Sequence, residues 1–226
     1  MRIAIAALVF TVGLCPAAVI TLNNPGFESG DTTGWVTAGS VTVDGTTTIN
    51  AWTIGPAGSY MAHLVNDGIP VASLETFLGV TPGLLSSGLP PGTATNGSAI
   101  YQDFSGNAGD TVTVYWAYVT EDYEEYNDPA FAVVSGPSGA QLTVLASIWN
   151  GGIQVGDYGA TGWHAFTYVL PATGAYRLGF GVVNTEDDEV SSHLFLDSAA
   201  GTVTPEPSTF ALLGAGLLGL SLLRRR

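Results

Sequence analysis

The sequence has no lysine, and its few basic residues lie almost entirely at the two ends of the chain. The 226 residues include five arginines, and four of these are Arg2 and Arg224–Arg226. Residues 18–204 therefore hold eighteen acids against Arg177 alone. So negative a body repels nucleic-acid phosphates and anionic lipid surfaces, and we predict neither partner. It favours divalent cations and neutral or cationic ligands, although keeping an extracellular domain soluble is the simpler role for the acids.

Cysteine and clustered histidines are also lacking. The one cysteine, Cys15, follows a bulky Leu14 in an N-terminal apolar run, which argues against lipid attachment there. A mature domain without cysteine must rely on core burial or bound metal for its stability. The histidines, His63, His164 and His193, stand singly without the spacing of a zinc site, so zinc is not predicted.

Catalytic motifs are missing as well. The mature body holds no Gly-x-Ser-x-Gly elbow, so a serine hydrolase has no support. A Gly-x-Gly-x-x-Gly pattern at 214–219 lies in an apolar run without the surrounding βαβ unit that dinucleotide binding requires. We therefore predict no catalytic residues.

The first eighteen residues have the features of a secretory signal. Arg2 precedes the apolar run Ile3–Leu14, and the small residues of Pro16–Ala18 then suit a signal peptidase. The run is short for a transmembrane helix. We predict a signal peptide at 1–18 and export of the rest across the inner membrane.

The C-terminal segment 204–226 combines a short motif, an apolar run and a basic end. Pro205, Glu206 and Pro207 precede the apolar run Phe210–Leu223, and Arg224, Arg225 and Arg226 follow it. As a helix the run is roughly 21 Å long against about 30 Å of hydrocarbon. This length predicts a transient inner-membrane anchor, with the arginines held in the cytoplasm.

This order of parts resembles the PEP-CTERM sorting signal. The resemblance implies processing of the tail by an exosortase, and a final location at the cell surface or outside the cell, among extracellular polysaccharides. A plain tail anchor is the alternative, but it would not need the Pro-Glu-Pro motif at that place.

Between the two ends, residues 19–203 show the alternating pattern of β-strands. Every second residue is apolar in Asp110–Val119, Gln141–Trp149 and Ala175–Val183. Further strands are predicted at Val19–Leu22, Ser40–Val43, Tyr60–Val65, Ala99–Phe104, Ala130–Val134, Trp163–Leu170 and Leu194–Asp197. Many short strands separated by turns predict an all-β fold, an antiparallel β-sandwich of jelly-roll type. A helix is expected at Ser73–Leu78 with Ser73 as its N-cap, and a loop at Thr81–Gly97.

The two ends of this domain resemble galactose-binding-like β-sandwiches, which include carbohydrate-binding modules. The likeness rests on Asn23–Gly30 with Gly34 and Trp35, and on Leu194–Asp197. It implies a structural Ca²⁺ between the first and last strands.

The implied calcium ligands are Glu28, Asp197 and the carbonyl oxygen of Gly26. Such hard oxygens are the donors that Ca²⁺ prefers, and a domain without disulfides would gain stability from the metal. The alternative is that both carboxylates cap turns.

Two acidic runs, Glu121–Asp128 and Glu186–Glu189, could bind Ca²⁺ or flank a glycosidic bond, but solvated loops explain them more simply. If one is functional, we expect the first, because Tyr123 and Tyr126 add faces on which a sugar can stack. Core packing accounts for Trp35, Trp116 and Trp163. A sugar platform is the alternative to core packing for Trp52, Trp149 and Tyr158.

Together these features predict a non-enzymatic surface or matrix protein that binds polysaccharide. The first alternative is a secreted carbohydrate-active hydrolase with its acids in Glu121–Asp128. The second is a purely structural protein that associates with itself.

Overall fold

The computed structural model describes residues 17–89 and 93–205. The apolar runs at both ends lie outside these residues, as do Cys15, Glu206, Pro207 and Arg224–Arg226. Within the described ranges, no helix combines the length and the apolar character needed to cross a membrane.

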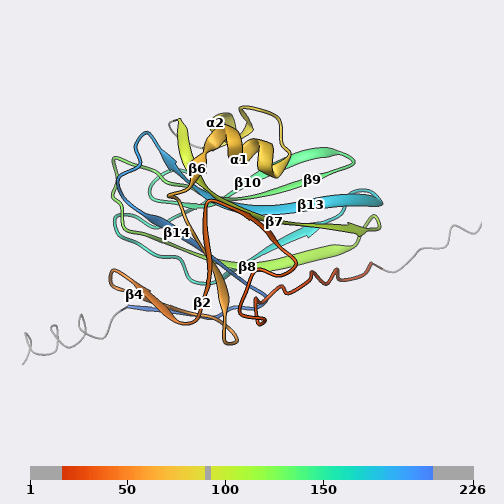
Figure 1. Ribbon diagram of the computed structural model, residues 1–226, viewed down its shortest axis with the longest axis horizontal. Coiled ribbons are helices and arrows are strands. Elements are labelled where there is room, and N and C mark those ends of the chain that lie inside the picture. Colours follow the sequence, from red (N-terminus) through yellow and green to blue (C-terminus); the bar gives the residue numbers. More distant parts are fainter. Residues whose placement is uncertain (1–16, 90–92, 206–226) are drawn as a thin grey trace, which may run out of the picture.

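Two sheets packed face to face form the body (Figure 1). The five-stranded sheet has the order β12 (His164–Val169), β8 (Thr111–Thr120), β14 (Ser192–Asp197), β5 (Met61–Val65) and β2 (Ser40–Asp44). The other sheet has the order β1 (Val36–Ala38), β7 (Ala94–Gly106), β13 (Gly174–Thr185), β9 (Ala130–Gly136), β10 (Gly139–Ser147) and β11 (Ile153–Gln154), with β6 (Ile69–Pro70) beside β7. All neighbouring strands are antiparallel except β10 and β11. The predicted all-β sandwich is confirmed.

The main core lies between the two sheets, because alternate side chains of each strand point inward. Leu194 and Leu196 of β14 join this core, as do Leu178 and Phe180 of β13. All four are fully buried, and burial of such apolar surface is the dominant stabilising term in folding.

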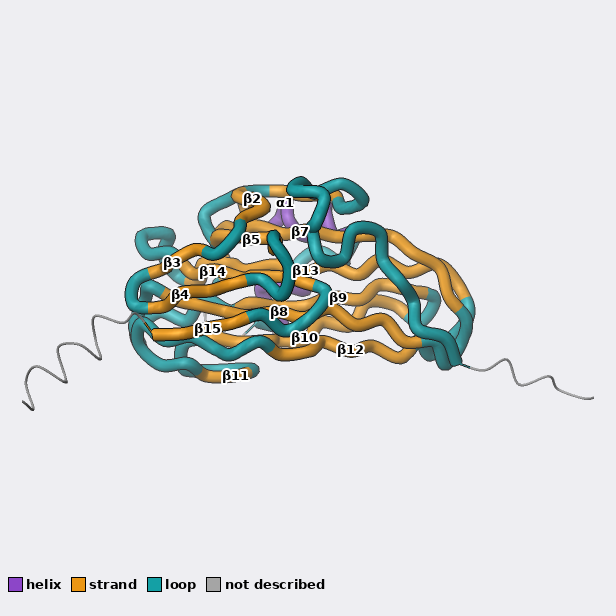
Figure 2. The backbone as a smooth tube through the Cα atoms, turned by 90° about the horizontal axis from the view of Figure 1, so that it is seen from below, coloured by secondary structure: helices purple, strands orange, loops and turns teal. Residues whose placement is uncertain are grey.

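A small third sheet covers the outer face of the five-stranded sheet. It has the order β15 (Thr202–Pro205), β4 (Trp52–Gly55) and β3 (Thr47–Ile49), and Figure 2 shows these three strands side by side. Ile54 packs there in one cluster with Met61 and Phe195 of the sheet beneath. Pro205 pairs with Trp52, so the strand crosses the predicted boundary at 203/204 and includes the first proline of the Pro-Glu-Pro motif.

Two helices, α1 (Val71–Leu78) and α2 (Leu84–Gly88), cover the outer face of the other sheet (Figure 1). The predicted helix at Ser73–Leu78 is confirmed, but it starts two residues earlier, and Pro70 rather than Ser73 is the N-cap. The predicted loop Thr81–Gly97 is wrong, since it contains α2 and the start of β7.

The side chain of Glu75 explains why α2 forms. Its carboxylate accepts the backbone N–H groups of Gly83 at 2.7 Å and Leu85 at 2.8 Å, and so caps the helix from outside. Local sequence patterns do not reveal a cap supplied from α1.

Most predicted strands are present within one to a few residues of their predicted bounds. Val19–Leu22 is the exception, because Val19 forms only an isolated bridge to Thr111. Six strands were not predicted, namely β1, β3, β4, β6, β11 and β15, and each has only two to four residues, too few to show a clear alternation.

Candidate functional site

The first candidate site lies where β14 ends. There Asp197 Oδ2 accepts the backbone N–H of Ala57 at 2.8 Å. The carboxylate of Glu28 accepts the N–H of Ser59 at 3.0 and 3.1 Å, and that of Tyr60 at 3.2 Å. Both predicted calcium ligands therefore hold the same turn, residues 57–60, which we call the turn end.

Gly26 adjoins this turn end. A Cβ atom on Gly26 would lie 3.2 Å from Asp197 Oδ1 and 2.6 Å from Ser198 Oγ, so a larger residue would displace these side chains. The structure thus brings the predicted ligands together, with their carboxylates used as turn caps. Burial raises the pKa of Asp197. Calcium at this place stays a prediction.

The opposite end of the sandwich gathers the predicted aromatic residues around the loop Glu121–Asp128. The ring of Tyr123 lies 5.5 Å from that of Tyr126 and 6.4 Å from that of Tyr158, measured between centroids. Tyr123 is 38% exposed and Tyr158 is 53% exposed. Trp52 Nε1 donates a hydrogen bond to the carbonyl oxygen of Tyr158 at 2.9 Å.

Trp149 belongs to the same end and is 38% exposed. Its backbone N–H donates to Asn127 Oδ1 at 2.9 Å, and this bond ties it to the acidic loop. We call the set Trp52, Tyr123, Tyr126, Trp149 and Tyr158 the aromatic end. Trp35 and Trp116 are buried in the core, as predicted.

Two open hollows flank these rings. One, of about 570 Å³, is lined by Asn50, Ala51, Glu121, Tyr158, Glu189, Val190 and Ser191. The other, of about 450 Å³, is lined by Glu124, Ile148, Trp149, Gln154, Val155, Gly156 and Asp157. Each hollow thus pairs one exposed aromatic ring with two acidic side chains.

A buried polar network lies beneath the aromatic end, where β14 begins. Asp128 accepts hydrogen bonds from Asn66 Nδ2 at 2.8 Å, from the Thr185 N–H at 3.0 Å and from Ser192 Oγ at 3.3 Å. Burial raises the pKa of Asp128 to about 8. This network could not be predicted from sequence patterns, because its members come from four separate segments.

Two of the scattered histidines, His63 of β5 and His193 of β14, lie next to each other. His63 Nε2 lies 2.9 Å from His193 Nδ1. The outer nitrogens face carboxylates: His63 Nδ1 lies 2.7 Å from Asp44 Oδ2, and His193 Nε2 lies 3.4 Å from Glu121 Oε2. Burial lowers the pKa of both histidines, and that of His193 falls to about 3. The pair was missed because 130 residues separate its members.

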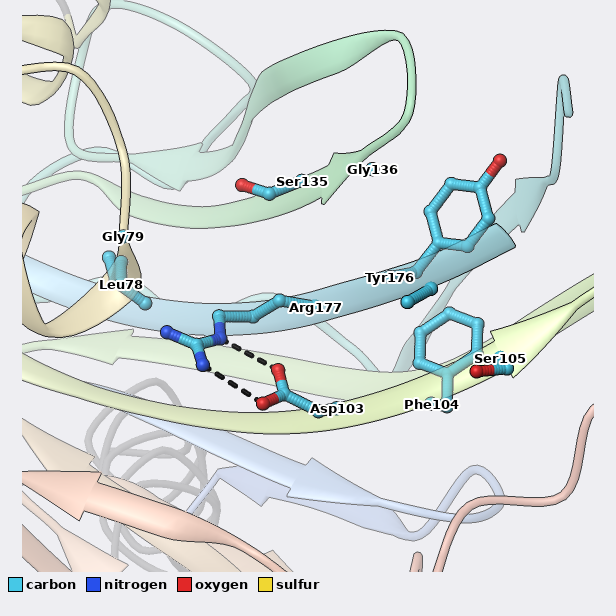
Figure 3. Close-up of a pocket in the computed structure, with 10 residues that line it drawn as sticks. Leu78, Gly79, Asp103, Phe104, Ser105, Ser135, Gly136, Tyr176 and Arg177 are labelled. Atoms are coloured by element: carbon cyan, nitrogen blue, oxygen red, sulfur yellow. Dashed lines mark hydrogen bonds and ion pairs between the residues drawn. The ribbon is translucent and has the colours of Figure 1, made fainter. Parts of the chain in front are cut away.

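A further hollow, of about 580 Å³, lies beside α1 on β7, β9 and β13 (Figure 3). Arg177 Nε donates to Asp103 Oδ1 at 2.7 Å and Arg177 Nη2 donates to Asp103 Oδ2 at 2.9 Å. The guanidinium also lies 3.7 Å from the ring centroid of Tyr101, which adds a cation–π contact. Asp103 thereby neutralises the body's one arginine.

Among residues 17–89 and 93–205, no three His, Cys, Asp or Glu side chains converge as a metal site. In particular, His164 lies against Trp116 and away from the histidine pair.

Comparison with known proteins identifies the tail. A family model described as the PEP-CTERM protein-sorting motif matches residues 203–226. This motif implies export and a cell-surface location. No match was found among curated proteins.

Solved structures similar to the body include carbohydrate-binding modules with β-sandwich folds. TmCBM61, determined with beta-1,4-galactotriose, is 15% identical, with a TM-score of 0.39 and coverage of 82% of this chain and 97% of that one. The CBM22-1 xylan-binding domain of Paenibacillus barcinonensis Xyn10C is 17% identical, with a TM-score of 0.33 and coverage of 82% and 100%. The N-terminal cellulose-binding domain of Cellulomonas fimi beta-1,4-glucanase C is 13% identical, with a TM-score of 0.32 and coverage of 78% and 92%.

Proposed function

We propose that the protein is an exported, non-enzymatic surface protein that binds polysaccharide through the aromatic end. The observation that carries the proposal is the exposure of Tyr123, Trp149 and Tyr158 beside hollows lined by carboxylates. Aromatic faces pack against the C–H faces of sugar rings, and carboxylates accept hydrogen bonds from sugar hydroxyls. The strongly negative body suits a neutral glycan better than an anionic one.

The two ends of the chain supply the route. A signal peptidase removes residues 1–18, the apolar run near the C-terminus anchors the chain briefly in the inner membrane, and an exosortase then processes the tail. The protein acts afterwards in the extracellular polysaccharide layer of a biofilm or floc. Mass spectrometry of the mature protein tests this route: a C-terminus that still ends at Arg226 contradicts processing.

Affinity electrophoresis in gels that contain neutral polysaccharides, including the host's own exopolysaccharide, tests the binding. We expect retention of the wild type, and a tenfold or greater loss of affinity in Tyr158→Ala and Trp149→Ala, equivalent to about 1.4 kcal/mol or more. Tyr60→Ala is the matched control, because Tyr60 is 39% exposed but lies at the turn end. Absence of wild-type retention on every gel, or an equal loss in the control, contradicts the proposal.

A secreted carbohydrate-active hydrolase is the second candidate, because Glu121 and Glu189 line the same hollow and glycosidases use carboxylate pairs. This function predicts release of reducing sugar that Glu121→Gln abolishes. Release that persists in Glu121→Gln, or no release from any polysaccharide retained by the protein, excludes this pair as catalytic.

A further inference from the structure

Three buried oxygens at the start of β14 lack hydrogen-bond partners among the described residues. They are Asp122 Oδ2, Thr185 Oγ1 and Asp187 Oδ1. Asp122 is 0% exposed and Thr185 is 1% exposed, whereas Asp187 is half-buried, so two of the three oxygens belong to residues shielded from bulk solvent. A buried carboxylate oxygen without a partner costs considerable free energy unless something positive lies next to it.

These oxygens belong to one cluster at the aromatic end. Burial raises the pKa of both Asp122 and Asp128, and the charge of the neighbouring Asp187 raises each further. Thr185 joins the cluster through its backbone N–H, which donates to Asp128 at 3.0 Å. The loops that carry them also meet, since the Glu121 N–H donates to the Ser191 carbonyl oxygen at 2.9 Å.

The remaining carboxylate in the cluster is already satisfied. Asp128 accepts hydrogen bonds from Asn66, Thr185 and Ser192. In Asp122 only Oδ1 accepts a hydrogen bond, which the backbone N–H of Tyr123 donates at 2.8 Å. The oxygens left over are therefore two carboxylate oxygens and one hydroxyl. Arg177 is the one arginine among the described residues, which hold no lysine, and it is bound to Asp103.

We propose that Asp122 Oδ2, Asp187 Oδ1 and Thr185 Oγ1 bind a divalent cation, Ca²⁺, with backbone carbonyl oxygens or water completing its shell. All the donors are hard oxygens, without nitrogen or sulfur, which favours Ca²⁺ over zinc or copper. Ca²⁺ also accepts flexible coordination geometry, whereas Mg²⁺ demands near-ideal octahedral geometry. The site is separate from the turn end and does not depend on sugar binding.

The cation would join the loop after β8 to the loop after β13. Both loops contribute to the hollow lined by Glu121 and Glu189, so the ion would hold two walls of that hollow in place. Few ligands and an extracellular setting predict a modest dissociation constant, of about 10⁻⁴ to 10⁻³ M.

Terbium luminescence of the purified full chain tests the site, because Tb³⁺ replaces Ca²⁺ and is sensitised by nearby tyrosines such as Tyr123. We expect saturable luminescence that Ca²⁺ competes away and that falls at least tenfold in Asp122→Asn and Asp187→Asn. Asp103→Asn, in the hollow beside α1 and outside both groups of carboxylates at β14, is the matched control and should keep the full signal. Circular dichroism establishes that each variant is folded.

The melting temperature supplies a second readout that needs no variant. Saturating Ca²⁺ should raise the melting temperature of the wild type relative to EDTA, and the shift should fall in Asp122→Asn but persist in full in Asp103→Asn. No saturable Tb³⁺ signal, or a signal lost in Glu28→Gln at the turn end and kept in Asp122→Asn, overturns the proposal. Glycan retention measured in EDTA is a separate observation, so failure of the metal site and failure of sugar binding are distinguishable.

Discussion

Strand β14 begins and ends next to buried carboxylates, and the partners of those carboxylates differ between its two ends. At the turn end, both oxygens of Asp197 accept backbone N–H groups. At the aromatic end, Asp122 and Asp187 each keep one buried oxygen without a hydrogen-bond donor among the described residues.

The difference separates two roles that look alike in sequence. A carboxylate surrounded by N–H donors stabilises a turn by itself, whereas a buried carboxylate short of donors calls for a cation. Family resemblance directs a calcium prediction to the turn end. The hydrogen bonds favour the aromatic end for a metal, and the following experiments test the contrast.

Removal of the satisfied carboxylate should have the largest effect. Asp197→Ala removes the acceptor of the Ala57 and Ser198 N–H groups, and a hydrogen bond to a charged group contributes about 1.5–3 kcal/mol. We expect a fall of about 2–3 kcal/mol in the free energy of unfolding, measured by urea denaturation in EDTA. If Asp197→Ala has the wild-type free energy of unfolding in EDTA, these hydrogen bonds contribute nothing to stability, and the two ends of β14 do not differ in the way described.

The histidine pair formed by His63 of β5 and His193 near the start of β14 should give the next largest effect, through pH. The pKa of His193 falls from 6.5 to about 3 on folding, and that of His63 also falls. Below pH 6.5 the unfolded chain therefore binds protons that the folded chain does not, so stability decreases as the pH falls. The loss is up to about 1.4 kcal/mol per pH unit for each histidine.

Urea denaturation at pH 7 and pH 5 measures this loss. Asp44 and Glu121 face the pair and moderate its titration, so the test compares variants that keep both acids. The double variant His63→Gln and His193→Gln should show a clearly smaller pH dependence than the wild type, and His164→Gln should not. If the double variant loses as much stability between pH 7 and pH 5 as the wild type, groups other than these histidines cause the loss.

The sequence predicted the long strands well and the sites only in part. Period-two alternation identified β8, β10 and β13, because alternation is local to each strand. The aromatic end was also foreseen from Trp149 and Tyr158. The histidine pair and the network around Asp128 were not, because the first depends on the pairing of β14 with β5 and the second also on that of β13 with β9.

The unpartnered oxygens were beyond sequence reasoning for a different reason. The acidic runs Glu121–Asp128 and Glu186–Glu189 read as solvated loops, and most of their acids are exposed. Asp122 and Asp128 are buried instead, because the loops fold back over β14. Burial of one residue within an acidic run depends on tertiary contacts that its neighbours in sequence do not record.

The smallest effect, and the one with opposite sign, is expected at Asp122 in the absence of metal. Asp122→Asn keeps an Oδ1 acceptor for the Tyr123 N–H and replaces the unpartnered oxygen by an N–H₂ donor. It also removes a buried charge that repels Asp187. In EDTA we therefore expect the free energy of unfolding to rise by about 1 kcal/mol.

Asp197→Asn is the matched control for this rise in the free energy of unfolding. At the turn end the same exchange places an amide N–H₂ next to backbone N–H groups that need an acceptor, so it should lower the free energy of unfolding. Urea denaturation of both variants in EDTA, and again in saturating Ca²⁺, completes the comparison. In Ca²⁺ the wild type should have a higher free energy of unfolding than Asp122→Asn, since only the wild type keeps both carboxylate ligands. The free energy of unfolding of Asp197→Asn should stay below that of the wild type with or without Ca²⁺. If Asp122→Asn destabilises in EDTA as Asp197→Asn does, the two ends of β14 satisfy their carboxylates alike and the case for a cation at the aromatic end falls.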